Sequence, residues 1–145
     1  MRILIAYASY SGNTKEVAEH IEHHLQKERI DADMHHIDVD PFPEDVRSYD
    51  MIFLGTFTWD YGATPDEVKD FVYNVGYKPE RVAVFGTGDT QFGEEYQYCI
   101  AVDKLAKFYN SPWKGLKIEQ SPRGMQEQYI EQWLRGVLSD VYVYA

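Results

Sequence analysis

Cysteine is almost absent from this sequence, because Cys99 is the only one in 145 residues. A single thiol excludes an intrachain disulfide and a metal cluster built from several thiolates of this chain. A free thiol fits a reducing compartment, and residues 2–5 open the chain without the features of a secretory signal. We therefore expect a cytoplasmic protein in which Cys99 is a small apolar core residue.

Long hydrophobic runs and an excess of basic residues are also missing. No apolar stretch approaches the roughly 20 residues that a membrane-spanning helix needs, so we expect no membrane partner. There are 14 Lys and Arg residues against 24 Asp and Glu, a formal net charge of −10. Nucleic acid requires clustered cations, and we exclude it as a partner. A phosphate ester bound here would need to be held by something other than net charge.

The sequence does contain an alternation of strand-like and helix-like segments, at a length that suits a single domain over residues 1–145. Apolar or alternating runs predict strands at 2–8, 31–37, 50–56, 81–86 and 114–120, the second of them at a sheet edge. Apolar residues at helical spacing predict three helices. These residues are Val17, Ala18, Ile21 and Leu25; Ala101, Val102, Leu105 and Phe108; and Ile130, Trp133, Leu134, Val137, Leu138 and Val141.

A further helix is predicted by its start signal. Thr64 stands at the N-cap, Pro65 at the first helical position and Glu67 at the third, which is a capping-box arrangement. The helix should run to about Val75.

Five strands alternating with helices predict an α/β three-layer sandwich, with a parallel sheet and right-handed crossovers. In such sheets, ligands bind beyond the carboxyl ends of the strands, where the strand order reverses. The loops that follow the first, third and fourth strands are therefore the candidate site.

The first of these loops reads Ser9-Tyr10-Ser11-Gly12-Asn13-Thr14 and stands at the start of a helix. Hydroxyls, backbone N–H groups and the positive end of the helix dipole can bind a phosphate without any cationic side chain. The loop is neither a Walker A motif nor a G-x-G-x-x-G fingerprint. A plain N-cap and turn is the alternative interpretation.

The other two loops carry aromatic residues and glycines. The loop at 56–62 contains Trp59 and Tyr61, which could wall a flat heterocycle or merely close the top of the core. The loop at 86–93 has three glycines that let backbone groups approach a ligand, and Phe92 could supply the opposing face. An ordinary turn is again the alternative.

The segments Ser-Tyr-Ser-Gly-Asn-Thr, Thr-Phe-Thr-Trp and Gly-Thr-Gly-Asp-Thr, followed by Cys99 and Ala101-Val102-Asp103, resemble short-chain flavodoxins over essentially the whole chain. The resemblance implies strand order 2-1-3-4-5, non-covalent FMN at the switch point, and electron carriage rather than an enzyme activity on a separate substrate. It implies cofactor contacts from three groups of residues: Ser9, Tyr10, Ser11, Gly12, Asn13 and Thr14; Thr56, Phe57, Thr58, Trp59, Asp60 and Gly62; and Thr87, Gly88, Asp89, Phe92 and Gly93.

The same resemblance implies a role for each group. Ser9, Ser11, Asn13 and Thr14 would bind the phosphate, Trp59 and Phe92 would flank the isoalloxazine, and backbone around Thr58, Asp60, Gly88 and Asp89 would meet its polar edge. Two positions depart from the family. Asp60 replaces a common glycine, which predicts weaker stabilisation of the half-reduced flavin. Phe92 replaces a tyrosine and keeps its stacking face.

A second flavodoxin-fold family is also similar. Segments 60–65, 92–98 and 111–113 resemble the small flavoproteins that activate manganese-dependent class Ib ribonucleotide reductase. That alternative implies two-electron reduction and reaction with dioxygen, in place of single-electron shuttling. The well-developed first helix, the second strand and Trp59 favour a general flavodoxin.

Acidic residues gather on or just after the second and third loops, at Asp60, Asp66, Glu67, Asp70, Asp89, Glu94 and Glu95. We expect this acidic collar to steer the basic surfaces of redox proteins, a reductase donor and an acceptor enzyme, toward a monomeric carrier. An ordinary solvated acidic surface is the alternative.

Two further interpretations fit the sequence less well. His20 and His24 share the first helix at metal-site spacing, but a solvated polar face is expected there. A response-regulator-like receiver would need an acidic pocket after the first strand and an aspartate ending the third. The chain has hydroxyls and Thr56-Phe57-Thr58 at those places.

Overall fold

The computed structural model describes residues 1–58, 63–88 and 99–143. Strands and helices alternate along these residues, with one short 3-10 turn. The strands are β1 (Ile3–Tyr7), β2 (Ala32–His36), β3 (Met51–Phe57), β4 (Val82–Gly88) and β5 (Leu116–Glu119). The helices are α1 (Asn13–Lys27), the 3-10 turn η1 (Val46–Ser48), α2 (Asp66–Val75), α3 (Ile100–Phe108) and α4 (Met125–Val143).

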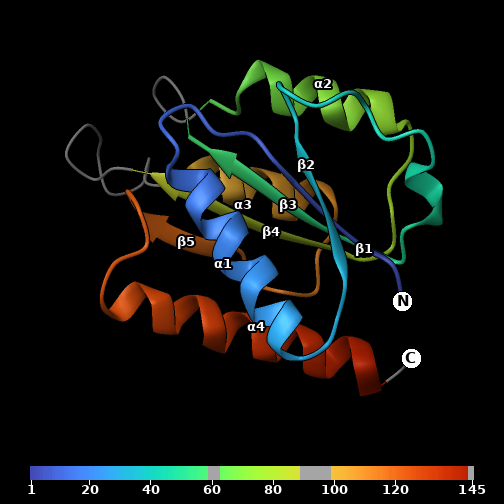
Figure 1. Ribbon diagram of the computed structural model, residues 1–145. Helices are drawn as coiled ribbons and strands as arrows, with labels where there is room; N and C mark the ends of the chain where they lie inside the picture. Colours follow the sequence, from blue (N-terminus) through green and yellow to red (C-terminus); the bar gives the residue numbers. More distant parts are fainter. Residues whose placement is uncertain (59–62, 89–98, 144–145) are drawn as a thin grey trace.

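The strands form one sheet in the order β2-β1-β3-β4-β5, and every neighbouring pair is parallel. Helices α1 and α4 cover one face of the sheet, and α2 and α3 cover the other (Figure 1). The predicted flavodoxin-like three-layer sandwich is therefore confirmed. No helix in the described part of the chain is long and apolar enough to cross a membrane.

The central strands are apolar on both faces because each face has its own core. Along β1, Ile3 and Ile5 pack toward α1 and α4, while Leu4 and Ala6 pack toward α2 and α3. A strand that alternates between two buried faces has no polar side to expose, which explains the continuous apolar run in the sequence. The edge strand β2 is only partly buried, as predicted.

The three helices predicted from apolar spacing are present, and most of the residues that predicted them are buried in the core. Phe108 is 40% exposed, whereas Tyr109 is 9% exposed and packs in the core. Helix α3 ends at Phe108, and Tyr109 occupies the C-cap. The helix predicted through Phe108 is therefore confirmed, although the side chain of its last residue lies at the surface.

The capping box at Thr64 is not formed. Helix α2 starts at Asp66, with Pro65 as the N-cap in an extended conformation (φ −57°, ψ 143°), and no side chain caps the helix. The carbonyl of Pro65 accepts the N–H groups of Val68 and Lys69, both at 3.1 Å. The helix therefore begins one residue later than predicted, while its end at Val75 is confirmed.

Strands β3 and β4 extend further than their hydrophobic runs. Phe57 pairs with Thr87, and Gly88 pairs with Glu119 of β5. Residues that the sequence placed in loops are therefore held in the sheet by backbone pairing, which does not require apolar side chains.

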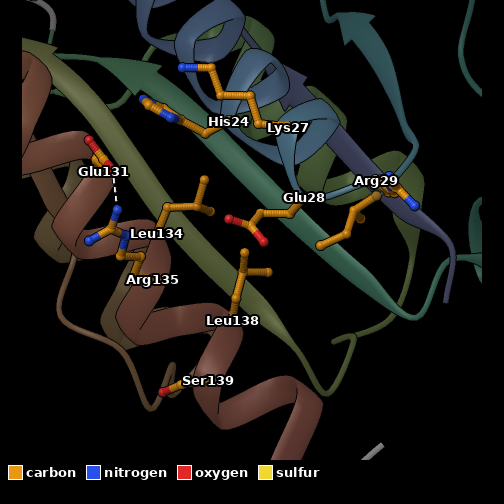
Figure 2. Close-up of a pocket in the computed structure, with 10 residues that line it drawn as sticks. His24, Lys27, Glu28, Arg29, Glu131, Leu134, Arg135, Leu138 and Ser139 are labelled. Atoms are coloured by element: carbon orange, nitrogen blue, oxygen red, sulfur yellow. Dashed lines mark hydrogen bonds and ion pairs between the residues drawn. The ribbon is translucent and has the colours of Figure 1, made fainter.

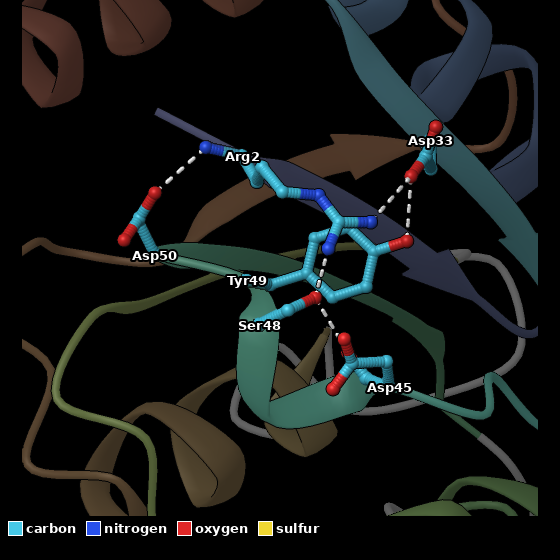
Figure 3. Close-up of polar contacts among 6 residues, drawn as sticks. All are labelled: Arg2, Asp33, Asp45, Ser48, Tyr49 and Asp50. Carbon is cyan, nitrogen blue, oxygen red and sulfur yellow. Dashed lines mark hydrogen bonds and ion pairs between the residues drawn. The ribbon is translucent and has the colours of Figure 1, made fainter.

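Polar contacts fasten the amino ends of β1, β2 and β3 (Figure 3). The Arg2 guanidinium lies 4.6 Å from the centroid of the Tyr49 ring and 3.6 Å from Asp33 Oδ2, and it donates to Ser48 Oγ. The Tyr49 hydroxyl donates to Asp33 Oδ2 at 2.6 Å, and the Arg2 N–H donates to Asp50 Oδ2 at 2.7 Å. Burial and then the hydrogen bond to Asp33 raise the pKa of Tyr49.

The outer edge of β5 is occupied by the side chain of Gln126, from the start of α4. Its Oε1 accepts the N–H of Glu119 at 2.7 Å, and its Nε2 donates to the carbonyls of Glu119 at 3.0 Å and Ser121 at 3.2 Å. One side-chain amide therefore makes the hydrogen bonds that a neighbouring strand would make.

Candidate functional site

The turn between β1 and α1 is organised by a serine hydroxyl. Ser9 Oγ accepts the N–H of Gly12 at 3.1 Å and the N–H of Lys15 at 3.3 Å. Gly12 has φ +93°, and a Cβ added there would meet nothing within 4 Å. The left-handed backbone, rather than close packing, is what this position requires of its residue.

The start of α1 presents backbone donors. The first helical hydrogen bond runs from the Glu16 N–H to the Gly12 carbonyl at 3.0 Å. Within residues 1–58, 63–88 and 99–143, no protein acceptor takes the N–H of Ser11, Asn13 or Thr14. Together with the helix dipole, such donors favour an anion at this end of the helix.

Acidic groups lie close to the same turn. Tyr7, the last residue of β1, stacks on His36 with ring centroids 4.8 Å apart. Burial, followed by the negative charges of Asp40 and Glu19, raises the pKa of Tyr7. The side-chain charges that act on Tyr7 are negative, so they add nothing to the support that the backbone donors give an anion at the β1–α1 turn.

Thr14 and Thr87 are brought together by the fold. Thr14 lies in the first turn of α1 and Thr87 near the end of β4, and their Oγ1 atoms are 2.8 Å apart. Both residues are buried, at 1% and 4% exposed. The sequence predicts Thr14 and Thr87 in separate loops. The signal that could have joined them is the register of β4, in which Ala83, Phe85 and Thr87 share the face that α1 covers.

The hydroxyls at the end of β3 are engaged in local bonds. The buried Thr56 Oγ1 donates to the carbonyl of Phe57 at 2.8 Å, and Thr58 Oγ1 accepts the N–H of Ala101 at 3.2 Å. The second bond joins the segment after β3 to the start of α3. These two threonines hold the carboxyl ends of the strands in place.

A surface pocket of about 480 Å³ lies between the β1–α1 turn and the start of α2. Tyr10, which is 77% exposed, and the half-buried Phe57 line one side, with ring centroids 6.3 Å apart. Asp66, Glu67 and Lys69 line the other side. This pocket was not predictable from the loops alone, although Asp66 and Glu67 follow the second loop closely.

At the end of β4, the glycines have different roles. A Cβ on Gly86 would overlap Val102 of α3 and the carbonyl oxygen of Thr56, so packing requires glycine there. The carbonyl of Gly88 accepts the N–H of Gln120 at 2.7 Å. Cys99 is fully buried and lies 4.0 Å from the carbonyl oxygen of Gly86, which confirms the prediction of a core residue.

The remaining predicted site residues lie outside the described part of the chain. They are Trp59, Asp60, Gly62, Asp89, Phe92 and Gly93. The hypothesis about Asp60 and the flavin radical, and the acidic collar residues Asp89, Glu94 and Glu95, fall there too.

A larger pocket, of about 810 Å³, lies between the end of α1 and α4 (Figure 2). Leu134 and Leu138 point into it, and the Glu28 carboxylate projects between them and α1. The Arg135 guanidinium pairs with Glu131 at its side. Because α1 is about 22 Å long at 1.5 Å per residue, this pocket is remote from the β1–α1 turn.

The fold and the turn define a class of protein. It is a doubly wound α/β protein whose helix-start donors lie at the point where the strand order reverses, between β1 and β3. The family model described as Flavodoxin matches residues 5–133, and the chain belongs to the flavodoxin family.

Similar proteins agree with this assignment. The chain is 36% identical over 138 residues to probable flavodoxin 2 of Bacillus subtilis, covering 89% of each chain. It is 35% identical over 104 residues to flavodoxin 1 of Escherichia coli K12, covering 70% of this chain and 57% of that protein. Oxidised flavodoxin 1 of Bacillus cereus superimposes with a TM-score of 0.82 at 27% identity, over 96% of this chain and 98% of that one. The chain is therefore an FMN-binding electron-transfer protein.

Proposed function

We propose that residues 9–14 hold the phosphate of FMN. The observation that carries this proposal is the set of N–H groups on Ser11, Asn13 and Thr14, which have no acceptor in the described part of the chain. Their geometry fits a phosphate because the left-handed Gly12 and the Ser9 hydroxyl hold the turn open at the helix start. Neutral donors then bind the phosphate on a protein of net charge −10.

We propose further that the segments after β3 and β4 hold the ring. Trp59 and Phe92 flank the isoalloxazine, and backbone near Thr58, Asp60, Gly62, Gly88, Asp89 and Gly93 meets its polar edge. Support comes from the sheet: Phe57 pairs with Thr87, so the two segments leave neighbouring strands at one level. Bound FMN supplies one- and two-electron redox chemistry, and the protein positions it.

For the partners, we propose redox proteins with basic surfaces. Asp66 and Glu67 stand beside the exposed ring of Tyr10 at the entrance to the proposed site, and Asp70 follows them on α2. Carboxylates in this place attract a basic partner and raise its association rate. We propose a monomeric carrier that forms one domain and acts in the cytoplasm, where its single thiol stays reduced.

The test is reconstitution of the flavin-free protein. FMN should bind with one molecule per chain, give a flavin visible spectrum and quench the cofactor's fluorescence. Riboflavin, which lacks the phosphate, should bind at least about tenfold more weakly, because charge-assisted hydrogen bonds are lost. A protein that stays colourless with FMN would contradict the proposal and would favour the response-regulator-like receiver instead. Equal affinity for the two flavins would place the phosphate away from residues 9–14.

The reductase-activator alternative gains no specific support from the relatives reported above. Most of the residues that suggested it, within 60–65 and 92–98, lie outside the described part of the chain. We therefore propose electron carriage alone.

A further inference from the structure

The hydroxyls of Thr14 and Thr87 carry two protons, but the hydrogen bond between them needs only one. Each hydroxyl carries one proton and can also accept, so the 2.8 Å bond between them consumes one of the two protons. Neither hydroxyl makes another hydrogen bond within the part of the chain that the structure describes. A buried donor without an acceptor is unfavourable, so the second proton calls for an oxygen beyond those of the described residues.

The position of the pair in the fold indicates where such an oxygen could bind. Thr14 lies beside the N–H groups of Ser11 and Asn13 at the start of α1, where an anion is favoured. Thr87 lies further inside, in β4 between Phe57 of β3 and Ile118 of β5. If Thr87 donates to Thr14, then Thr14 is free to donate outward, and both protons are used.

We propose that Thr87 is a positioning residue for the phosphate group. It acts through Thr14, by holding that hydroxyl as an acceptor so that its own proton is directed to a phosphate oxygen. The pair thereby favours phosphorylated flavin over flavin without phosphate. This inference rests on the proposed function, in which the β1–α1 turn holds the phosphate of FMN.

The consequence is a selective change in affinity. Thr87→Val keeps the shape of the side chain and removes its hydroxyl, so the dissociation constant for FMN should rise about threefold to tenfold. Thr14→Val removes the direct donor and should raise it about tenfold to a hundredfold. The dissociation constant for riboflavin should change by less than about twofold in both variants, because no phosphate is present to lose the bond.

The experiment is fluorescence titration of flavin-free protein with FMN and with riboflavin, for wild type and each variant. Thr87→Ser restores a hydroxyl without the methyl group and should return the ratio of the two dissociation constants to that of wild type. Ser121→Ala is the control. It also removes a buried hydroxyl but lies after β5, outside residues 9–14 and the pocket beside Tyr10, and it should leave the ratio unchanged.

A double variant tests whether Thr87 acts through Thr14. Adding Thr87→Val to Thr14→Val should raise the FMN dissociation constant by less than about twofold, because the residue it acts through is already lost. Thr87→Ala provides the same comparison if the valine variant unfolds, since it also lacks the hydroxyl.

Three results would overturn the inference. They are equal losses of FMN and riboflavin affinity in Thr87→Val, failure of serine to restore the ratio, and additive losses in the double variant. Each would reduce Thr87 to a packing role. These results differ from failure of the proposed function, in which wild type itself would bind FMN no better than riboflavin.

Discussion

Gly12 and Gly136 both have room for a Cβ atom, but their backbone conformations differ. An added Cβ would meet nothing within 4 Å at either position, but Gly12 has φ +93° and Gly136 lies inside helix α4. Gly12→Ala should therefore lower the free energy of unfolding by about 1–2 kcal/mol through backbone strain. Gly136→Ala should raise it by about 0.5–1 kcal/mol, because alanine is favoured in helices. Urea unfolding of the flavin-free proteins measures both values, and two changes of the same sign would contradict the argument.

Tyr109 makes stability depend on alkaline pH. Burial raises its pKa to about 12 from an ordinary 10.0. Because the unfolded chain releases this proton first, stability is fully present below pH 10 and falls as the pH rises through the folded-state pKa. Tyr109→Phe should remove this part of the loss between pH 10 and pH 12, measured by urea unfolding.

Tyr73→Phe is the control for that measurement, because Tyr73 is exposed on α2. It should leave the alkaline slope of the wild type unchanged. Tyr7 and Tyr49 also have raised pKa values and keep part of the slope, so the contradicting result is a slope in Tyr109→Phe as steep as that of the wild type.

At the scale of the elements, the contact between Tyr49 and Asp33 joins η1 to the edge strand β2 (Figure 3). Tyr49→Phe keeps the ring beneath Arg2 and removes the hydroxyl, so we expect a loss of about 1 kcal/mol in the free energy of unfolding. Tyr77→Phe is the matched control, because its ring lies 3.9 Å from Arg47 and stays in place. Equal losses in the two variants would show that the Asp33 bond adds no stability.

The elements were predictable where side-chain chemistry decides them. The buried strands and the faces of α1 and α4 follow from apolar spacing, since burial on a known face requires apolar residues. The extension of β4 to Gly88 was not predicted, because backbone pairing with Glu119 decides it. The N-cap at Pro65 was missed for a similar reason, since its extended ψ of 143° overrides the capping signal at Thr64.

The candidate site was predictable as a set of loops but not as a network. The sequence predicts a turn at Ser9 and Gly12 before a helix, and that turn is present, while its phosphate is a proposal. The sequence could not show that Ser9 Oγ accepts two backbone N–H groups, or that Thr14 meets Thr87. Such contacts depend on the distance between strand ends, which only the assembled sheet determines.

For the whole molecule, charge distribution governs encounter with partners. If Asp66 and Glu67 steer basic proteins, the double variant Asp66→Asn, Glu67→Gln should slow electron transfer to a basic haem protein at least about twofold at low salt. Its rate should also fall less steeply with ionic strength, measured by stopped-flow absorbance. Glu28→Gln, Glu80→Gln changes the net charge equally on exposed residues elsewhere. A rate equally affected by both pairs would indicate a general charge effect.

Gln126 has a consequence for how molecules of this protein meet one another. A strand at the edge of a sheet is a template on which another chain can add its own strand, and this is a common route to aggregation. Here the outward N–H and carbonyl of Glu119 are already satisfied by one side-chain amide. Helix α4 thus caps the edge of β5 at Glu119, so a strand from another molecule cannot pair with β5 there unless Gln126 is displaced.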